Sequence, residues 1–185
     1  MKAANPEGVF VFYPGGAGPA FLSQYDQAGL TGKVALYSAY TIDALSLPLL
    51  QKAGSKGALG TYLTQMWAAD MDNAANKKFV ADFKAKYGSY PSYYAAQSYD
   101  AIMLIKSAVE AVKGNLKDMD GMRKAMEAAK FDSVRGPIKM GPNHFPIQSF
   151  YANEVVADKD GVWMNSLRQT VFKDHQDSYA ADCKM

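Results

Sequence analysis

Short apolar runs alternate with helical stripes in the first third of the chain. The run at 9–13 is continuous and rich in β-favouring residues, which is typical of a buried parallel strand. A Pro-Gly-Gly turn follows, and apolar residues then recur at helical spacing up to Gly29. Strands are also predicted at 34–38 and 60–66; between them, a proline makes the segment 43–53 kinked or only partly helical. This alternation predicts a right-handed parallel α/β layer.

The middle of the chain has the pattern of three successive helices. Asp72 or Asn73 can cap the first, which closes at Gly88. The second, at 95–113, is apolar nearly all round, so we expect it to be buried on more than one side. Asp118 can cap the third, whose methionines at 119, 122 and 126 we interpret as core packing and not as a metal or cofactor site. These helices need a sheet that the chain does not obviously contain.

The last third is predicted to be extended and then irregular. Extended segments are expected at 134–140 and 148–156. After Asp158 the pattern becomes polar and mixed, with a strand at 161–164 and a weak terminal segment. The sequence shows no internal repeat and no low-complexity tract.

Composition and charge narrow the class of protein. Apolar residues make up 49% of the 185 and charged residues 21%, the balance of a soluble globular protein. The net charge of +2 and the absence of a Lys/Arg cluster argue against nucleic acid as a partner. No apolar run reaches the roughly 18 residues of a membrane span, and the start lacks the apolar core of a signal peptide. The single cysteine, Cys183, is either a free thiol on the tail or the partner of a cysteine outside this chain.

Four local patterns are specific as a set because of their order and spacing. They are the strand and glycine turn at 9–16 with its helix, the helix start at 70–83, the Tyr-Gly-Ser-Tyr-Pro turn and helix start at 87–101, and the segment 131–148. Together they resemble the Leu/Ile/Val-type solute-binding proteins, also called type I periplasmic binding proteins. The resemblance runs from about Val9 to Val156.

The resemblance implies an α/β fold of parallel sheet layers with flanking helices, in an incomplete two-lobed architecture. Residues 1–67 would form the second half of the C-terminal lobe, 68–150 the returning segment of the N-terminal lobe, and 151–185 the return to the C-terminal lobe and a tail. The family's opening section, including its signal peptide, has no counterpart in these residues.

The implied function is capture of a small organic solute by lobe closure. The ligand would be a branched-chain or other amino acid, or a small aromatic carboxylate, passed to the membrane permease of an ABC importer. The implied location is the periplasm, or the outer surface as a lipoprotein, and no cofactor is needed. Such a protein is not an enzyme. The same fold serves alternatively as a ligand-sensing receptor or regulator domain.

A hydrolase-type enzyme is the less favoured alternative. The chain has no Gly-x-Ser-x-Gly elbow, no Gly-x-Gly-x-x-Gly fingerprint and no His/acid cluster. His144 and His175 lie far apart without metal-ligand spacing.

The first candidate binding segment is Gly15, Gly16, Ala17 and Gly18, because ligands of open α/β sheets bind outside the carboxyl ends of strands. Small residues let a ligand approach the backbone, and a helix N-terminus offers free N–H groups to an anion. The alternative is a tight strand-to-helix turn without a binding role.

The second candidate segment is Tyr40, Thr41 and Asp43, at the next strand end. By position it resembles the place where amino-acid binders keep an acid for the ligand ammonium, so Asp43 could form a charge-assisted bond. Alternatively Asp43 caps a helix. Tyr40 offers an apolar wall with a polar tip. Trp67, at the predicted lobe crossing, lines the cleft or packs in the core.

Two further positions are interpreted as structural. Tyr99 and Asp100 match the family pattern, and we expect Asp100 to interact with the dipole of the first turn of its helix. Arg135 could bridge lobes, although an exposed salt link is favoured. If the chain lacks its partner half, the isolated 185 residues are expected to expose apolar surface and to dimerise or swap elements.

Overall fold

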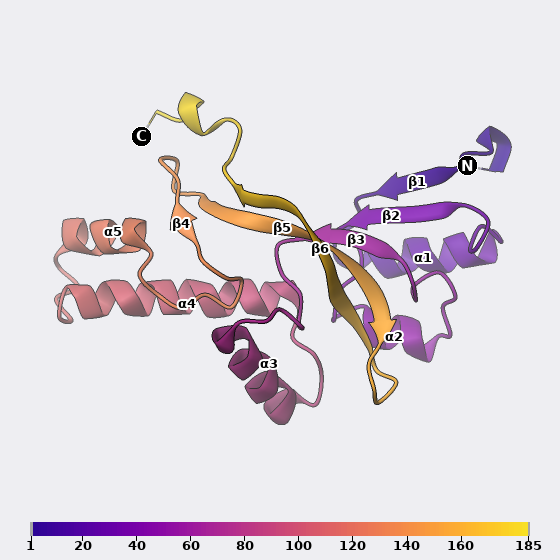
Figure 1. Ribbon diagram of the computed structural model, residues 1–185, viewed down its shortest axis with the longest axis horizontal. Helices are drawn as coiled ribbons and strands as arrows, with labels where there is room; N and C mark the ends of the chain where they lie inside the picture. Colours follow the sequence, from indigo (N-terminus) through magenta and orange to yellow (C-terminus); the bar gives the residue numbers. More distant parts are fainter. Residues whose placement is uncertain (1, 185) are drawn as a thin grey trace.

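The protein forms one open sheet with helices around it (Figure 1). The structure is a computed structural model that describes residues 2–184. Its elements in chain order are η1 (Lys2–Ala4), β1 (Gly8–Val11), α1 (Ala17–Gln27), β2 (Ala35–Ala39), α2 (Leu47–Lys52), β3 (Tyr62–Gln65), α3 (Ala74–Tyr87), α4 (Tyr93–Ala111), α5 (Met119–Ala128), β4 (Lys139–Met140), β5 (Pro146–Ala157), β6 (Trp163–His175) and η2 (Ala180–Asp182). The sheet order is β1-β2-β3-β5-β4, and β6 pairs with β5.

The first three strands are parallel, which confirms the predicted α/β layer. The burial predicted for the run at 9–13 is wrong, because β1 is an edge strand and Phe10 and Phe12 are 68% and 59% exposed. Apolar residues of α1, α2, β3, β5 and the segments on either side of α2 meet in a core cluster: Leu22, Ile42, Leu47, Leu50, Ala58, Leu63 and Val155. Of the two alternatives for the segment 43–53, the structure has the partly helical one, since α2 covers only Leu47–Lys52, and it has no kink at the proline. Pro48 is the second residue of α2, where the missing N–H has no helical partner to lose.

A long antiparallel hairpin of β5 and β6 completes the sheet beside β3. The prediction of a short strand and a weak terminal segment after residue 158 is wrong, because β6 runs for 13 residues. Its outer half, from Arg168 onward, is exposed on both faces and therefore shows no alternation of apolar and polar residues. Pairing with β5 holds this half of β6 in place, and pairing leaves no periodic signal in the sequence.

The three predicted helices are present, and a side chain caps the N-terminus of each. Asn73, Ser92 and Asp118 each accept a hydrogen bond from a backbone N–H in the first turn of α3, α4 and α5, at 2.8, 3.3 and 2.9 Å. α4 begins at Tyr93 and not at Ala95. Figure 1 shows α4 and α5 side by side, away from β1–β3.

The burial predicted for α4 and α5 is wrong in this chain. Ile102 is 64% exposed and Ile105 47%, so α4 is not covered on more than one side. Met119 is 66% exposed, and Met122 and Met126 are only half-buried, so these methionines are not core residues. The faces expected to lie on a sheet therefore remain exposed to solvent.

The prediction that 134–140 is extended throughout is wrong, because only Lys139–Met140 is a strand. A turn at 133–136 precedes it: Gly136 has φ +89° and donates its N–H to the Ser133 carbonyl. A buried ion pair fixes this turn. The Nε of Arg135 donates to Asp100 at 2.7 Å, with side-chain exposures of 10% and 1%.

The ion pair between Arg135 and Asp100 shows that two predictions about these residues are wrong. The salt link of Arg135 is buried and not exposed. Asp100 lies about two turns beyond the start of α4, so it does not interact with the first turn. Its carboxylate instead accepts hydrogen bonds from the Ser133 hydroxyl and the Val134 N–H.

Among residues 2–184, no helix combines the length and apolar character needed to span a bilayer. Within the same range, no group of three or more His, Cys, Asp or Glu side chains is placed to hold a metal ion. The thiol of Cys183 is exposed.

Candidate functional site

A pocket of about 180 Å³ opens at the carboxyl ends of β1 and β2. Its lining combines the glycine turn after β1, the segment after β2 and one residue of α4: Gly15, Gly16, Pro19, Asp43, Leu45, Ser46, Leu49 and Tyr94. The structure thus brings Gly15, Gly16 and Asp43 together, as residues of one pocket. A cavity of about 150 Å³ can hold a benzene molecule, so the pocket has the size of a single-ring compound.

Two positions of the glycine turn require glycine, each for a different physical reason. Gly15 has φ +68°, a left-handed conformation that favours glycine. Gly18, in the first turn of α1, lies against the backbone of the segment after β2: an added Cβ would be 2.1 Å from the Thr41 carbonyl oxygen. The Gly18 N–H already donates to the Gly15 carbonyl at 3.2 Å. Gly18 therefore sets the distance between the two strand ends.

Gly18→Ala is expected to destabilise the chain by about 1–3 kcal/mol and to distort the pocket, since backbone must move to admit the methyl group. Gly16→Ala is the matched control, because the same added Cβ meets nothing within 4 Å and φ is −64°. Thermal and urea unfolding of both variants checks this prediction. Equal loss of stability in the two variants would contradict the assignment of Gly18 as the packing glycine.

Thr41 and Asp43 both hold the segment after β2 in place. The Thr41 hydroxyl donates to the Ala39 carbonyl and accepts the Tyr13 N–H, each at 3.0 Å, which ties the end of β2 to that of β1. One carboxylate oxygen of Asp43 accepts the N–H groups of Leu45 and Ser46 at 2.9 and 3.2 Å. Asp43 thus caps the turn before α2, whose N-cap residue is Ser46. The pairing of Asp43 with a ligand ammonium stays a prediction.

Three aromatic rings outside the pocket lining are connected to it through Tyr94, whose ring centroid lies 4.0 Å from that of Tyr93. Tyr40 packs edge-on against Tyr93 at 5.2 Å between ring centroids and against Phe12 at 6.4 Å. Tyr40 has φ +51°, an unusual conformation for a bulky residue, which the surrounding contacts hold. Burial raises the pKa of the Tyr40 and Tyr93 hydroxyls above the ordinary value, so both stay neutral and act as hydrogen-bonding groups in the physiological range.

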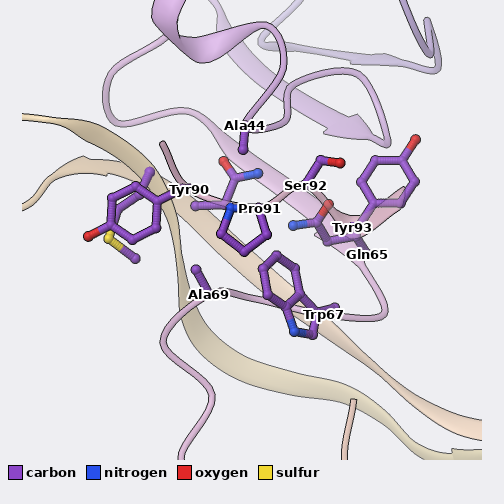
Figure 2. Close-up of a pocket in the computed structure, with 10 residues that line it drawn as sticks. Ala44, Gln65, Trp67, Ala69, Tyr90, Pro91, Ser92 and Tyr93 are labelled. Carbon is purple, nitrogen blue, oxygen red and sulfur yellow. The ribbon is translucent and has the colours of Figure 1, made fainter. Parts of the chain in front are cut away.

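Trp67 does not line this pocket. Its side chain is 2% exposed, donates its indole N–H to Asn76 at 2.7 Å and packs edge-on against Phe79. The core interpretation is therefore the one that the structure favours. Figure 2 shows Trp67 beside Gln65 and Pro91, at a separate small cavity.

Sequence reasoning missed Tyr93 and Tyr94, together with Leu45 and Leu49. The two leucines are each 65% exposed and form an apolar wall of the pocket. The signal available in the sequence was the aromatic pair directly after the Ser92 cap, which places two rings at the start of α4. Their approach to the β2 end is a long-range contact that no local pattern encodes.

A polar link joins the turn before α4 to the β5–β6 turn. The Tyr90 hydroxyl donates to Asp158 at 2.8 Å, and the Lys84 ammonium lies 3.9 Å from the centre of the Tyr90 ring. The Tyr90 hydrogen bond, followed by that of the Val162 N–H, holds the pKa of Asp158 below its ordinary value. The link fixes the start of α4, and with it Tyr93 and Tyr94, relative to the sheet.

Because the pKa of Asp158 is depressed in the folded state, its contribution to stability is present above the ordinary Asp value of about 3.9 and is lost as pH falls through the folded pKa. Tyr90→Phe is expected to raise the pKa of Asp158 towards the ordinary value. Carboxyl NMR titration measures this shift directly. An unchanged Asp158 titration in Tyr90→Phe would contradict the assigned cause.

Comparisons with known proteins agree with this architecture. The chain is 31% identical over 182 residues to Leu/Ile/Val-binding protein homolog 6 of Brucella abortus (strain 2308), covering 94% of this chain and 45% of that protein. It is similar to the solute-binding protein of an ABC transporter from Rhodopseudomonas palustris BisB5 in complex with 3,4-dihydroxybenzoic acid: TM-score 0.83, 32% identity, 96% of this chain and 48% of that one. A solute-binding protein from R. palustris in complex with benzoate gives a TM-score of 0.76 at 31% identity, covering 91% and 45%.

The open sheet with flanking helices is the fold of the type I periplasmic binding proteins. The sequence pattern described as periplasmic binding protein matches residues 1–161, most of the chain. The chain therefore belongs to the periplasmic binding protein family. It spans about half the length of the relatives it matches.

Proposed function

We propose that the protein containing these residues captures a small organic carboxylate, with the pocket after β1 and β2 as one wall of the site, and passes it to the permease of an ABC importer. The ligand is bound and released chemically unchanged. Residues 1–67 and 151–185 belong to one lobe and 68–150 to the other, and the ligand stabilises their closed arrangement. The site of action is the periplasm or the outer face of the membrane.

The pocket is the observation that carries this proposal. Backbone and small residues at Gly15 and Gly16 admit a ligand closely, and the wall of Leu45, Leu49 and Tyr94 is apolar. The nearby rings of Tyr40 and Tyr93 suit a flat ring, and two similar solved proteins carry benzoates. Among the amino acids and aromatic acids expected from the sequence, these features favour an aromatic acid.

Isothermal titration calorimetry tests the proposal with the protein expressed from the complete open reading frame, beside the 185-residue chain alone. Benzoate, 3,4-dihydroxybenzoate and leucine serve as probes, and mass spectrometry of the recovered compound checks that it is unchanged. We expect saturable binding of an aromatic acid by the longer protein. Absence of binding for all three probes, or turnover of any of them, would contradict the proposal.

Tyr94→Leu is expected to weaken binding of the aromatic acid about tenfold, because Tyr94 lines the pocket and loss of a ring contact costs about 1–1.5 kcal/mol. Tyr37→Leu is the matched control, because Tyr37 is a tyrosine of the neighbouring β2 that does not line the pocket. An equal effect of the two substitutions would place the ligand elsewhere.

Size-exclusion chromatography of the isolated chain measures whether it dimerises.

A further inference from the structure

A larger cavity, of about 690 Å³, lies along the end of the β5–β6 hairpin where β4 pairs with β5. Figure 1 shows this end of the hairpin away from α1 and α2. The cavity shares no lining residue with the pocket after β1 and β2, and its volume is in the range of small-molecule sites. Its lining includes three cations, Arg135, Lys139 and Lys173, and one acid, Asp174. The only charged residue that lines the other pocket is Asp43, so the larger cavity is the one suited to an anion.

Lys139 and Lys173 reach the cavity from different strands and begin close together. Lys139 on β4 is the pairing partner of Ile147 on β5. The Asp174 N–H on β6 donates to the Ser149 hydroxyl at 3.2 Å, which places Lys173 beside Ser149. Ile147 and Ser149 are two residues apart on β5, a separation of about 7 Å. Both lysines are exposed, and within residues 2–184 neither forms an ion pair, so both ammonium groups are available to one ligand.

The guanidinium of Arg135 is attached to the same short piece of β5. Its Nη1 donates to Oε1 of Gln148, the residue between Ile147 and Ser149, at 2.7 Å. Its Nε donates to Asp100, also at 2.7 Å, and the side chain is only 10% exposed. The two bonds fix the guanidinium in the wall of the cavity. The three cations therefore meet at three consecutive residues of β5.

Hydroxyl groups complete the lining on β5 and β6. Ser149, Tyr151 and Thr170 all line the cavity, and Tyr151 pairs with Thr170 across the two strands. Hydroxyl, ammonium and guanidinium groups all donate hydrogen bonds, and bonds from the charged donors to an oxyanion are the stronger ones. The lining thus offers donors of three kinds to one bound group.

We propose that this cavity binds a small oxyanion, whose phosphate or carboxylate group is held by the two ammonium groups and the guanidinium. Arg135 is balanced by Asp100, so two lysines against the single acid Asp174 leave an excess of one positive charge. The bound oxyanion neutralises this excess and connects β4 to β6. The site is distinct from the pocket proposed for the aromatic acid.

Isothermal titration calorimetry of the 185-residue chain with sodium phosphate and with sodium citrate, at constant ionic strength, tests the site. We expect saturable binding of at least one of the two probes, and the tighter one shows whether the phosphate or the carboxylate group is preferred. The affinity is expected to fall as sodium chloride is added, because salt screens exposed charges. Absence of saturable binding for both probes would overturn the proposal.

Lys139→Gln and Lys173→Gln each remove one charge at an exposed position, and each is expected to weaken binding about threefold to tenfold. Lys33→Gln is the matched control, an exposed lysine that does not line the cavity. Tyr94→Leu changes the other pocket and is expected to leave this affinity unchanged. An equal loss in Lys33→Gln, a loss in Tyr94→Leu, or full affinity in both lysine variants would overturn the proposal.

Nitrogen-15 NMR of the same titration locates the bound probe on the chain. The largest shifts are expected at the N–H signals of Ser149 and Asp174, which lie beside the two lysines. Shifts centred on the glycine turn after β1 would instead assign the anion to the other pocket and overturn the proposal.

Discussion

Arg135→Ala is expected to lower the free energy of unfolding by about 3–5 kcal/mol, because it leaves the Asp100 carboxylate buried without its counter-charge. Asp100 is 1% exposed, and its remaining donors, Ser133 and the Val134 N–H, are both uncharged. The substitution also removes the bond from Arg135 to Gln148 at 2.7 Å, which connects the turn at 133–136 to β5. Urea unfolding followed by circular dichroism measures the loss.

Arg168→Ala is the matched control for this prediction. Arg168 also forms a short ion pair, with Glu154 at 2.6 Å, but its side chain is 40% exposed. A pair in contact with solvent contributes at most about 1 kcal/mol. The two substitutions therefore separate burial from charge pairing as such. If Arg135→Ala costs no more than Arg168→Ala, the buried pair does not stabilise this turn.

Asn76→Leu is expected to cost about 3 kcal/mol or more, because one buried amide serves several partners. Asn76 is 0% exposed; its oxygen accepts the Trp67 indole N–H, and its nitrogen lies within 3.1–3.4 Å of the carbonyls of Ala68, Ala69 and Met71. Leucine has a similar size and can pair with none of them. The segment between β3 and α3 would lose its anchor.

Asn73→Ala provides the scale for that effect. Asn73 caps the same helix, and loss of an N-cap side chain costs about 1 kcal/mol. Comparison of the two variants by thermal unfolding, with Trp67 fluorescence as a local probe, checks the prediction. Similar losses of stability, or an unchanged Trp67 signal in Asn76→Leu, would count against the anchoring role.

The parts of the fold that sequence predicts are those with a local signal. The strands β1 and β2 lie in apolar, β-favouring runs, and Asn73 and Asp118 are recognisable caps, so these strands and helices are confirmed. The exposed half of β6 carries no such signal, because it is stabilised by hydrogen bonding to β5 and not by burial of one face. Long-range pairing of this kind is invisible to hydrophobic periodicity.

The candidate site divides in the same way. Gly15, Gly16 and Asp43 are predictable because strand ends and glycine turns are local features, and the structure places all three in one pocket. Tyr94 reaches that pocket from a helix about 50 residues further along the chain, which no spacing rule indicates. The exposed position assigned to Arg135 failed for a related reason, since its partner Asp100 is distant in sequence.

The irregular ladder of the β5–β6 hairpin has a mechanical consequence. β5 bonds to β3 through Tyr151–Glu154 and to β4 through Pro146 and Ile147, and the register with β6 shifts three times between Gln148 and Asn153. Such shifts bend a strand and increase its local twist. If the part of the sheet at β4 rotates relative to the part at β3, the part of β5 between Gln148 and Asn153 would therefore twist together with β6. The parallel strands β1 to β3 would keep their shape.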